Sequence, residues 1–439
     1  MMPYKIAFVS LGCAKNLVNT EQMMALCRRA GHTVTGDPDG ADVAVLNTCG
    51  FIESAKSEAI ENILELAELK KAGRLKKLLV TGCLSQRYPD DIRTEVDGML
   101  GTGSYTDVAA AVEELMAGEK AEHFGNIHRT FEDGERLVTT PPYTAYLKIA
   151  EGCSNGCAFC IIPKLRGRYR SRSMEALLAE ARQLADSGVK ELIVIAQDIT
   201  RYGMDLEEPT SLAGLLKELC KLDFHWIRLH YLYPEVITDE LIDTIAREKK
   251  IVHYLDIPIQ HCNDGILKAM RRRNTRAELE DLFDRLRRAI PDLVVRTSLI
   301  CGLPGEGEAE FEELCQFLRE QKLQRVGVFQ FSPEEGTLAA AMEDQVDPET
   351  AARRVELVVD LQSRIMDEYN EARLGTVMEV LCEGFDAQAG CFAGRTYADS
   401  VEIDGRVLFT AAGAVPAGSF VNVRITGVSD GELTGEIEE

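Results

Sequence analysis

The stretch that decides the fold is Glu151-Gly152-Cys153-Ser154-Asn155-Gly156-Cys157-Ala158-Phe159-Cys160. It follows a short apolar run at residues 146–150, which predicts that the three cysteines lie at the carboxyl end of a β-strand, where α/β proteins place their sites. Gly152 and Gly156 let the backbone wrap closely around a bulky inorganic group. Three thiolates at the spacing C-x3-C-x2-C can hold three irons of a four-iron cluster and leave the fourth iron open. A zinc ion with a distant fourth ligand is the alternative, although zinc usually takes a second C-x2-C pair, and the sequence has none.

Six strand-then-helix units make up the module around this motif, at residues 139–371. Its helical patterns include one that begins at Met174 and ends before Gly188, a left-handed cap. Six parallel units favour an open or partial (β/α)6 barrel, because the closed form takes eight. An open, doubly wound sheet fits the same pattern. The strands are predicted near residues 146–150, 192–196, 226–231, 254–257, 294–300 and 325–331.

A smaller α/β module precedes it, at residues 3–120, and its three predicted strands end alike. Their ends are Val9-Ser10-Leu11-Gly12-Cys13, Val45-Leu46-Asn47-Thr48-Cys49 and Val80-Thr81-Gly82-Cys83. Because parallel strands put their carboxyl ends on one edge, Cys13, Cys49 and Cys83 are predicted to converge, where they could hold a second cluster. Three buried cysteines without a ligand role are the alternative, and Cys27 is predicted to be core. A helix over residues 53–71 is predicted to place Ala55, Ala59, Ile60, Ile63, Leu64 and Ala67 on one face.

The last module, at residues 373–439, alternates apolar and polar residues, as in Val377-Met378-Glu379-Val380-Leu381. Turn signals at Asp404-Gly405 and Asp430-Gly431 separate such segments, which predicts a small antiparallel β-barrel. A polar stretch with Asp133-Gly134-Glu135 and Pro141-Pro142 is predicted to link the first two modules. The predicted fold is therefore a multidomain α/β protein that ends in a β-barrel.

Bulk composition points to a cytoplasmic protein of several domains. The 439 residues are too many for one ordinary domain. The sequence shows no signal peptide and no apolar run near the ~18 residues that span a bilayer, so we expect a cytoplasmic location and no membrane contact. Thirteen cysteines in that compartment favour metal or redox chemistry over disulfides. A formal charge of -23 disfavours nucleic acid and favours basic partners.

The central cysteine spacing resembles that of the radical S-adenosylmethionine (SAM) enzymes. The resemblance implies that SAM binds the open iron through its amino and carboxylate groups. One-electron reduction then cleaves SAM to methionine and a 5′-deoxyadenosyl radical. Gln197 and Asp198 follow the second predicted strand, where this family contacts SAM, and Gly302 lies in a glycine-rich turn after the fifth, where the family approaches the adenine. Ordinary turn chemistry is the alternative for these three residues.

Longer pieces of the chain are similar to the methylthiotransferases of that family. They are Ser10-Leu11-Gly12-Cys13-Ala14-Lys15-Asn16, Asn47-Thr48-Cys49-Gly50-Phe51-Ile52, residues 151–167 and Phe331-Ser332-Pro333-Glu334-Glu335-Gly336-Thr337. The resemblance spans nearly the whole chain and implies an amino-terminal cluster-binding domain, a radical SAM barrel and a carboxyl-terminal TRAM barrel. It implies two [4Fe-4S] clusters, one on Cys13, Cys49 and Cys83 and the other on Cys153, Cys157 and Cys160. It also implies that one SAM methylates a sulfur atom, while a second supplies the radical that removes hydrogen from an unactivated carbon.

Three features favour the RimO-type branch, which modifies the β-carbon of an aspartate in small-subunit ribosomal protein S-twelve, over the branch that modifies adenosine in transfer RNA. Ala14-Lys15 follow Cys13, where the transfer-RNA branch typically has glutamine and methionine. The Pro333-Glu334-Glu335 form stands where that branch tends to carry arginine. From Leu374 onward, eleven Asp or Glu oppose three Arg, a net charge of -8, which would attract a basic protein and repel RNA.

Other assignments stay open at the level of sequence. The arginines at 166, 168, 170 and 172 could grip phosphate, but we interpret them as support for the cluster or SAM. We interpret the arginines at 271, 272 and 273 as a solvated face. No general base is assigned, and the candidates are Asp198, His261, Glu334 and Glu335. A reductase such as flavodoxin is implied by the resemblance. The alternative functions are methylthiolation of adenosine in transfer RNA and a non-catalytic metal-binding interaction module.

Overall fold

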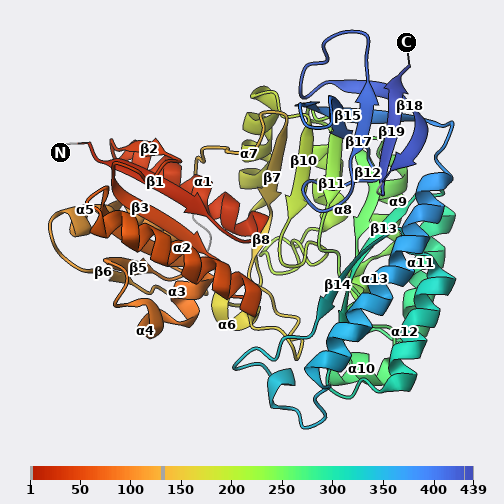
Figure 1. Ribbon diagram of the computed structural model, residues 1–439, viewed down its shortest axis with the longest axis horizontal. Coiled ribbons are helices and arrows are strands. Elements are labelled where there is room, and N and C mark those ends of the chain that lie inside the picture. Colours follow the sequence, from red (N-terminus) through yellow and green to blue (C-terminus); the bar gives the residue numbers. More distant parts are fainter. Residues whose placement is uncertain (1–2, 130–133, 430, 439) are drawn as a thin grey trace.

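A computed structural model describes residues 3–129, 134–429 and 431–438, and it shows an α/β part, a six-stranded barrel-like part and a small β-barrel in chain order (Figure 1). Two sequence predictions, the turn residue Asp430 and the linker residue Asp133, lie outside the described residues. No helix within those ranges has both the length and the apolar character that crossing a membrane requires.

The amino-terminal part is a parallel sheet in the order β2-β1-β3-β4-β5-β6. The sequence predicted β1, β3 and β4, whereas β2, β5 and β6 have three residues each and are too short to show a period. Helix α2 spans the predicted residues, but Ile60 and Leu64 are 45% and 49% exposed, so only part of the predicted apolar face is buried. The helix packs through a narrower stripe that includes Ala59 and Ile63. The bounds are β1 Lys5–Ser10, α1 Ala14–Arg29, β2 Thr33–Thr35, β3 Ala41–Thr48, α2 Glu53–Lys71, β4 Leu75–Gly82, α3 Cys83–Arg87, α4 Pro89–Ile92, β5 Gly98–Leu100, η1 Tyr105–Asp107, α5 Val108–Met116 and β6 Ala121–His123.

The middle part is a parallel sheet of six strands in the order β14-β13-β12-β11-β10-β7. Each strand pairs with its neighbour in sequence, so the sheet has no switch in strand order, which excludes the doubly wound alternative. Helices cover its outer face (Figure 1). The strands are β7 Thr144–Lys148, β10 Glu191–Ile195, β11 Trp226–Leu229, β12 Ile251–Asp256, β13 Val294–Cys301 and β14 Arg325–Gln330, with the small pair β8 Ala150–Glu151 and β9 Arg170–Ser171. The helices are α6 Ile162–Arg166, α7 Met174–Asp186, α8 Leu212–Leu219, η2 Pro234–Val236, α9 Asp239–Arg247, α10 Asp264–Ala269, α11 Arg276–Ala289, α12 Glu308–Gln321, η3 Ala339–Ala341 and α13 Pro348–Glu371.

Alternation along these strands separates an apolar outer face from a partly charged inner face. Leu192 and Val194 belong to the large core between sheet and helices, whereas Ile193 and Ile195 pack against α1 of the amino-terminal part. Val18 of α1 belongs to that second cluster. The first helix of the amino-terminal part therefore covers the inner face of the sheet near β7 and β10.

The carboxyl-terminal part is a closed barrel in the order β15-β16-β17-β19-β18. Four of its strand pairs are antiparallel as predicted, but β17 and β19 are parallel. A ring of five strands cannot alternate in direction all the way round, so one parallel pair is unavoidable. The strands are β15 Val377–Asp386, β16 Cys391–Arg395, β17 Val407–Thr410, β18 Phe420–Ser429 and β19 Glu432–Ile437.

A segment of this barrel, residues 396–404, packs against the six-stranded sheet. The carbonyl of Tyr397 accepts a hydrogen bond of 2.8 Å from Arg228, and Asp404 accepts one of 2.6 Å from Tyr254. Ser400 lies 2.9 Å from His230, which follows β11. The segment therefore closes one end of the sheet's interior.

Candidate active site

The amino-terminal trio, Cys13, Cys49 and Cys83, converges as predicted at the ends of β1, β3 and β4. Cys13 precedes α1, Cys49 follows β3 and Cys83 begins α3. Gly12 has a φ of +84°, and a β-carbon there would lie 2.7 Å from Cβ of Cys49, so the two loops touch. Burial first, and then the charges of Cys83 and Cys13, raise the pKa of the Cys49 thiol to about 11, which shows that the three sulfur atoms lie within electrostatic reach of one another.

A net of side-chain amides holds these strand ends in register. The amide of Asn16 donates to the carbonyls of Leu11 and Thr48, at 3.1 and 3.0 Å. Asn47 donates to the carbonyl of Asn16 at 2.9 Å. The sequence analysis assigned no role to Asn16 or Asn47, although Asn16 lies three residues after a predicted ligand. Both are fully buried or nearly so, which makes the positions of the cysteines well determined.

The barrel trio, Cys153, Cys157 and Cys160, lies in the loop between β8 and α6. Asn155 within this loop donates to Asp198 at 2.8 Å, which ties the loop to the residues after β10. Burial raises the pKa of Cys153 to about 11 and that of Cys160 to about 12, and the charge of Cys157 adds to both shifts.

A cation accompanies Cys157. Arg272 donates to its sulfur at 3.7 Å, and the hydroxyl of Tyr233 lies 3.7 Å from the same atom. The interpretation of Arg272 as a solvated residue is therefore wrong, because the side chain is 7% exposed. Its neighbour Arg271 has a φ of +56°, a turn of the backbone after α10 that directs Arg272 inward.

Arg166 connects the two trios. Its Nε donates to the sulfur of Cys83 at 3.4 Å, and its Nη1 lies 3.4 Å from a carboxylate oxygen of Glu151, two residues before Cys153. Burial would raise the pKa of Glu151, but Lys148 and Arg166 outweigh it and hold the pKa well below the ordinary range. One buried guanidinium thus contacts the amino-terminal trio and the approach to the barrel trio.

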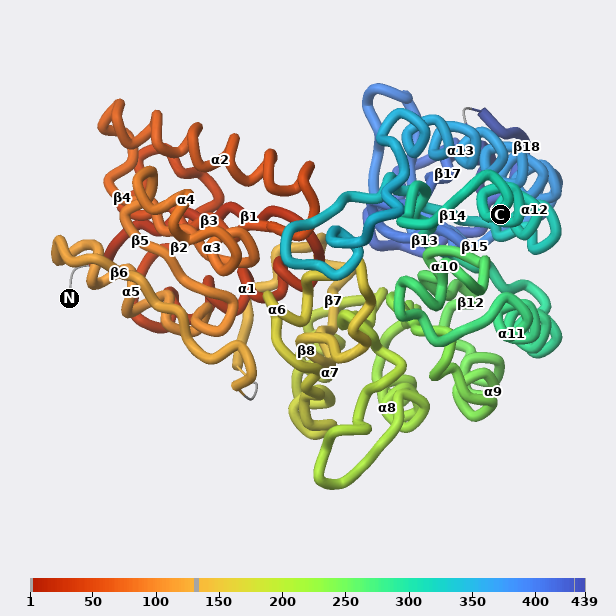
Figure 2. Tube along the Cα trace, turned by 90° about the horizontal axis from the view of Figure 1, so that it is seen from below, coloured from red at the N-terminus to blue at the C-terminus, as the bar shows by residue number. Residues whose placement is uncertain are grey.

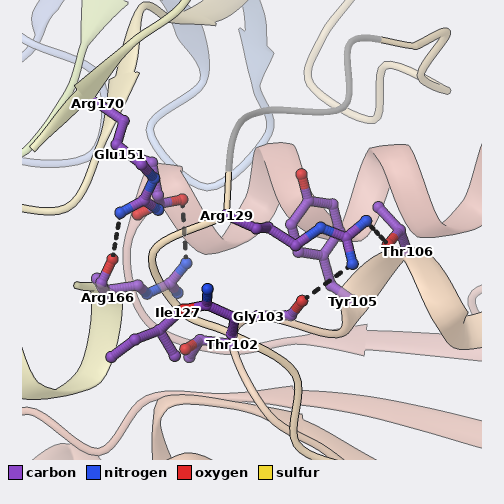
Figure 3. A pocket seen from close by; sticks show the side chains of 10 residues that line it. Thr102, Gly103, Tyr105, Thr106, Ile127, Arg129, Glu151, Arg166 and Arg170 are labelled. Carbon is purple, nitrogen blue, oxygen red and sulfur yellow. Dashed lines mark hydrogen bonds and ion pairs between the residues drawn. The ribbon is translucent and has the colours of Figure 1, made fainter. Parts of the chain in front are cut away.

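A small pocket of about 30 Å³ with charged residues in its lining lies beside this contact (Figure 3). Figure 3 shows Arg166 facing Glu151, with Arg129 and Tyr105 across the pocket. Arg170 donates to the carbonyl of Arg166 at 3.3 Å and extends the cationic wall. The volume is enough for one water molecule or an ion of similar size.

A second cavity, of about 300 Å³, is lined by all three parts of the chain. Cys13 is exposed and lies in its wall beside Tyr146 of β7. Glu383 and Glu402 of the carboxyl-terminal barrel also line it. The cavity is large enough for amino-acid side chains and leads to a thiol of the amino-terminal trio.

The contact between the amino-terminal part and the sheet is charged and buried. Glu334, in the segment after β14, accepts from Arg87 at 2.8 Å and lies 3.2 Å from Lys56. Figure 2 shows this segment extending towards the amino-terminal part near α6. Arg87 ends the helix that Cys83 begins, so the Glu334 contact fixes that helix to the barrel.

The candidate SAM contacts are occupied in part by other groups of the chain. Gln197 donates to Glu151 at 2.9 Å, and its carbonyl oxygen is buried without a partner in the described residues. Asp198 is fully buried and accepts from Asn155 and from Thr200 N–H at 3.0 Å. The amide of Gly302 donates to Glu306 at 3.0 Å, and a β-carbon at Gly302 would collide with α13. Packing against α13 is therefore enough to explain why residue 302 is a glycine.

Two further candidate general bases, Glu334 and His261, are held in different ways. Glu334 is held in the ion pairs above, and although burial opposes the shift, Ser332, Arg87 and Lys56 lower its pKa. His261 is fully buried, and its Nε2 lies 3.6 Å from Glu306. The ion pairs of Glu334 suit a structural role, whereas Nε2 of His261 has no hydrogen-bond partner among the described residues, and no general base is assigned.

The donor chemistry of both trios fits iron–sulfur clusters. Each trio offers three thiols, and each has a cation against one sulfur, Arg166 at Cys83 and Arg272 at Cys157, which suits an anionic cluster. Among the described residues, no three His, Cys, Asp or Glu side chains are close enough to hold a single metal ion. A four-iron cluster has a different requirement, because each thiolate binds a different iron.

Comparisons with known proteins agree with this chemistry. Residues 147–318 match the Radical SAM superfamily, residues 5–101 the Uncharacterized protein family UPF0004, and residues 374–437 the TRAM domain. A protein of Lachnoclostridium phytofermentans named ribosomal protein uS12 methylthiotransferase RimO is 47% identical over 439 residues, 99% of this chain and all of that protein. A protein of the same name from Thermoanaerobacter sp. is 45% identical over 98% of this chain and 99% of its own. The chain belongs to the RimO-type radical SAM methylthiotransferases.

Solved structures show the same fold at much lower identity. The radical SAM methyltransferase TsrM from Kitasatospora setae, solved with cobalamin and a [4Fe-4S] cluster, has a TM-score of 0.57 and 13% identity over 77% of each chain. The cobalamin-dependent enzyme OxsB has a TM-score of 0.51 and 12% identity, covering 82% of this chain and 56% of its own. The predictions of family, enzyme class and fold class for this methylthiotransferase are confirmed.

Proposed function

We propose that this methylthiotransferase adds a methylthio group to the β-carbon of an aspartate in ribosomal protein uS12, with a [4Fe-4S] cluster on each trio and two molecules of SAM. The observation that carries the proposal is the contact of Arg166 with Cys83 and with Glu151, which brings the two trios to one interface. Relatives that carry the uS12 name, 45% and 47% identical over nearly the whole chain, support the substrate.

The ligands of the two clusters would be Cys13, Cys49 and Cys83 on one side and Cys153, Cys157 and Cys160 on the other. When bound, the clusters and SAM supply the radical, the methyl group and the place where sulfur is held. The protein's own part is to exclude water, to compensate cluster charge through Arg166 and Arg272, and to orient the substrate carbon.

The finer assignments belong to the same proposal. Gln197, Asp198 and Gly302 are the proposed SAM contacts, and the unpartnered carbonyl oxygen of Gln197 supports the first of them. The proposed domains are residues 3–120, 139–371 and 373–439. We propose a reductase such as flavodoxin as electron donor and a cytoplasmic location, where a ribosomal protein is available. Glu383 and Glu402 beside the 300 Å³ cavity suit a basic protein substrate.

Iron content tests the two-cluster part of the proposal. Anaerobic reconstitution should give about eight irons per chain, and alanine at Cys13, Cys49 and Cys83 together should leave about four. Cys391→Ala, in a half-buried position of the carboxyl-terminal barrel, is the matched control and should keep all of them. Four irons in the unaltered chain would contradict the second cluster, and zinc alone would support a non-catalytic module.

Mass spectrometry tests the substrate. Reconstituted enzyme with uS12, SAM, sulfide and a reductant should add one methylthio group in place of one hydrogen, located to an aspartate by fragmentation. An unchanged uS12 together with turnover on transfer RNA would overturn the assignment in favour of the nucleic-acid branch.

A further inference from the structure

Lys15 is a buried cation between the amino-terminal trio and the inner face of the sheet. It lies two residues after Cys13 in the first turn of α1 and is 7% exposed. Its Nζ lies 3.3 Å from the centre of the Tyr231 ring, just beyond β11 of the other domain. The side chain therefore spans the domain interface.

Local physical chemistry disfavours a lysine at this place. The first turn of a helix carries a partial positive charge, which repels a cation, and the first turn of α1 has no acidic residue to compensate it. Buried lysines are almost always paired with a carboxylate, yet among the described residues the direct side-chain partner of Lys15 is Tyr231 and no carboxylate forms an ion pair with it. A cation–π contact offsets only part of the cost of burial.

A carboxylate near Lys15 is engaged by another cation. Asp256, at the end of β12, is the carboxylate within electrostatic reach, but it forms an ion pair with Arg296 at 2.8 Å. Asp256 also accepts the backbone N–H of Tyr231 at 3.2 Å. Tyr231 has a φ of +67°, a strained conformation for a bulky residue, and such strain is concentrated at functional sites. The ammonium group therefore lies against the side chain of Tyr231 and not against a carboxylate.

We propose that Lys15 binds the carboxylate of the substrate aspartate and thereby selects aspartate as the residue to be modified. The proposal rests on the function proposed above. Because the carboxyl carbon of aspartate is bonded directly to its β-carbon, an ion pair at Lys15 would place the reacting carbon near Cys13, whose thiol lies within electrostatic reach of Lys15. The substrate carboxylate would then be the ion-pair partner of the buried ammonium group.

Competition between two forms of uS12 tests the proposal, with asparagine in place of the target aspartate in one of them. Asparagine has nearly the same shape but no charge. Lys15→Met should lower kcat/KM for the aspartate form about 100-fold, because the substitution leaves the substrate carboxylate desolvated without its partner. The value of kcat/KM for the asparagine form should change much less. Lys15→Arg should restore part of the preference. The affinity of the reconstituted enzyme for both forms, measured by fluorescence anisotropy, should follow the same order.

Two controls separate this role from others. Iron content should stay at the value of the unaltered enzyme in Lys15→Met, and Lys71→Met, an exposed lysine of α2, should leave the preference for aspartate unchanged. An unchanged preference in Lys15→Met would overturn the inference. So would the loss of about four irons, because Lys15 would then serve the cluster. Failure of the unaltered enzyme to modify uS12 would instead refute the proposed function, so the two failures are distinguishable.

Discussion

Replacing Glu191 by glutamine should weaken the contact between the carboxyl-terminal barrel and the sheet by about 3 kcal/mol at pH 7. Glu191 begins β10, is fully buried and forms ion pairs with Arg228 at 2.9 Å and Arg395 at 2.6 Å. Burial by itself would raise its pKa, but Arg395 and Arg228 outweigh burial and lower the pKa from 4.5 to about 2. That difference corresponds to about 3 kcal/mol of folding free energy, in the range measured when one partner of a buried pair is removed.

The sign of the pH dependence follows from the lowered pKa. The contribution of Glu191 is complete well above pH 4.5 and is lost as the pH falls from 4.5 towards 2, where the carboxyl group becomes protonated in the folded state as well. The difference between the unaltered chain and Glu191→Gln should therefore be constant between pH 7 and about 5.5. It should shrink to about 1 kcal/mol near pH 3.

The chain carries its own probe for this measurement. Trp226 is its single tryptophan, is 5% exposed and packs edge-on against Phe420 of the carboxyl-terminal barrel, with ring centres 4.7 Å apart. A urea titration followed by tryptophan fluorescence therefore reports on this interface. Glu379→Gln, which removes a half-exposed pair with His225, is the matched control and should cost less than about 1 kcal/mol. A Glu191→Gln effect no larger than the control, or one that does not diminish in acid, would refute the reasoning.

Three further outcomes are expected at the candidate site. Gly12→Ala places a β-carbon 2.7 Å from Cys49 on a backbone with φ +84°, so anaerobic reconstitution should lose about four irons, whereas Gly31→Ala, with open space around it, should lose none. Arg272→Met removes a cationic donor from Cys157 and should lower the reduction potential of the barrel cluster in an EPR-monitored titration, and an unchanged potential would contradict the contact. Glu334→Gln breaks the pairs with Arg87 and Lys56, so limited proteolysis between the domains should be faster at equal iron content, and an unchanged cleavage rate would count against its role.

Sequence patterns were sufficient where a residue's role follows from its own segment. The three strand ends with cysteine predicted the amino-terminal trio, because parallel strands share an edge. Sequence patterns were insufficient where a residue's partner lies far away in the sequence. Glu334 pairs with Arg87, 247 positions away, so no local pattern predicts that it is unavailable as a base. Arg272 was misjudged because its burial depends on the backbone turn at Arg271, and a run of three arginines shows no such turn.

The segment at residues 396–404 has a consequence for modular evolution. Its contacts with Arg228, His230 and Tyr254 place carboxyl-terminal residues inside another domain's interior, so the small barrel cannot be treated as an interchangeable attachment. In a chimera with the barrel of a distant relative, the segment equivalent to residues 396–404 would meet side chains to which it is not matched. Successful exchange would therefore require this segment and its three partners to be transferred together.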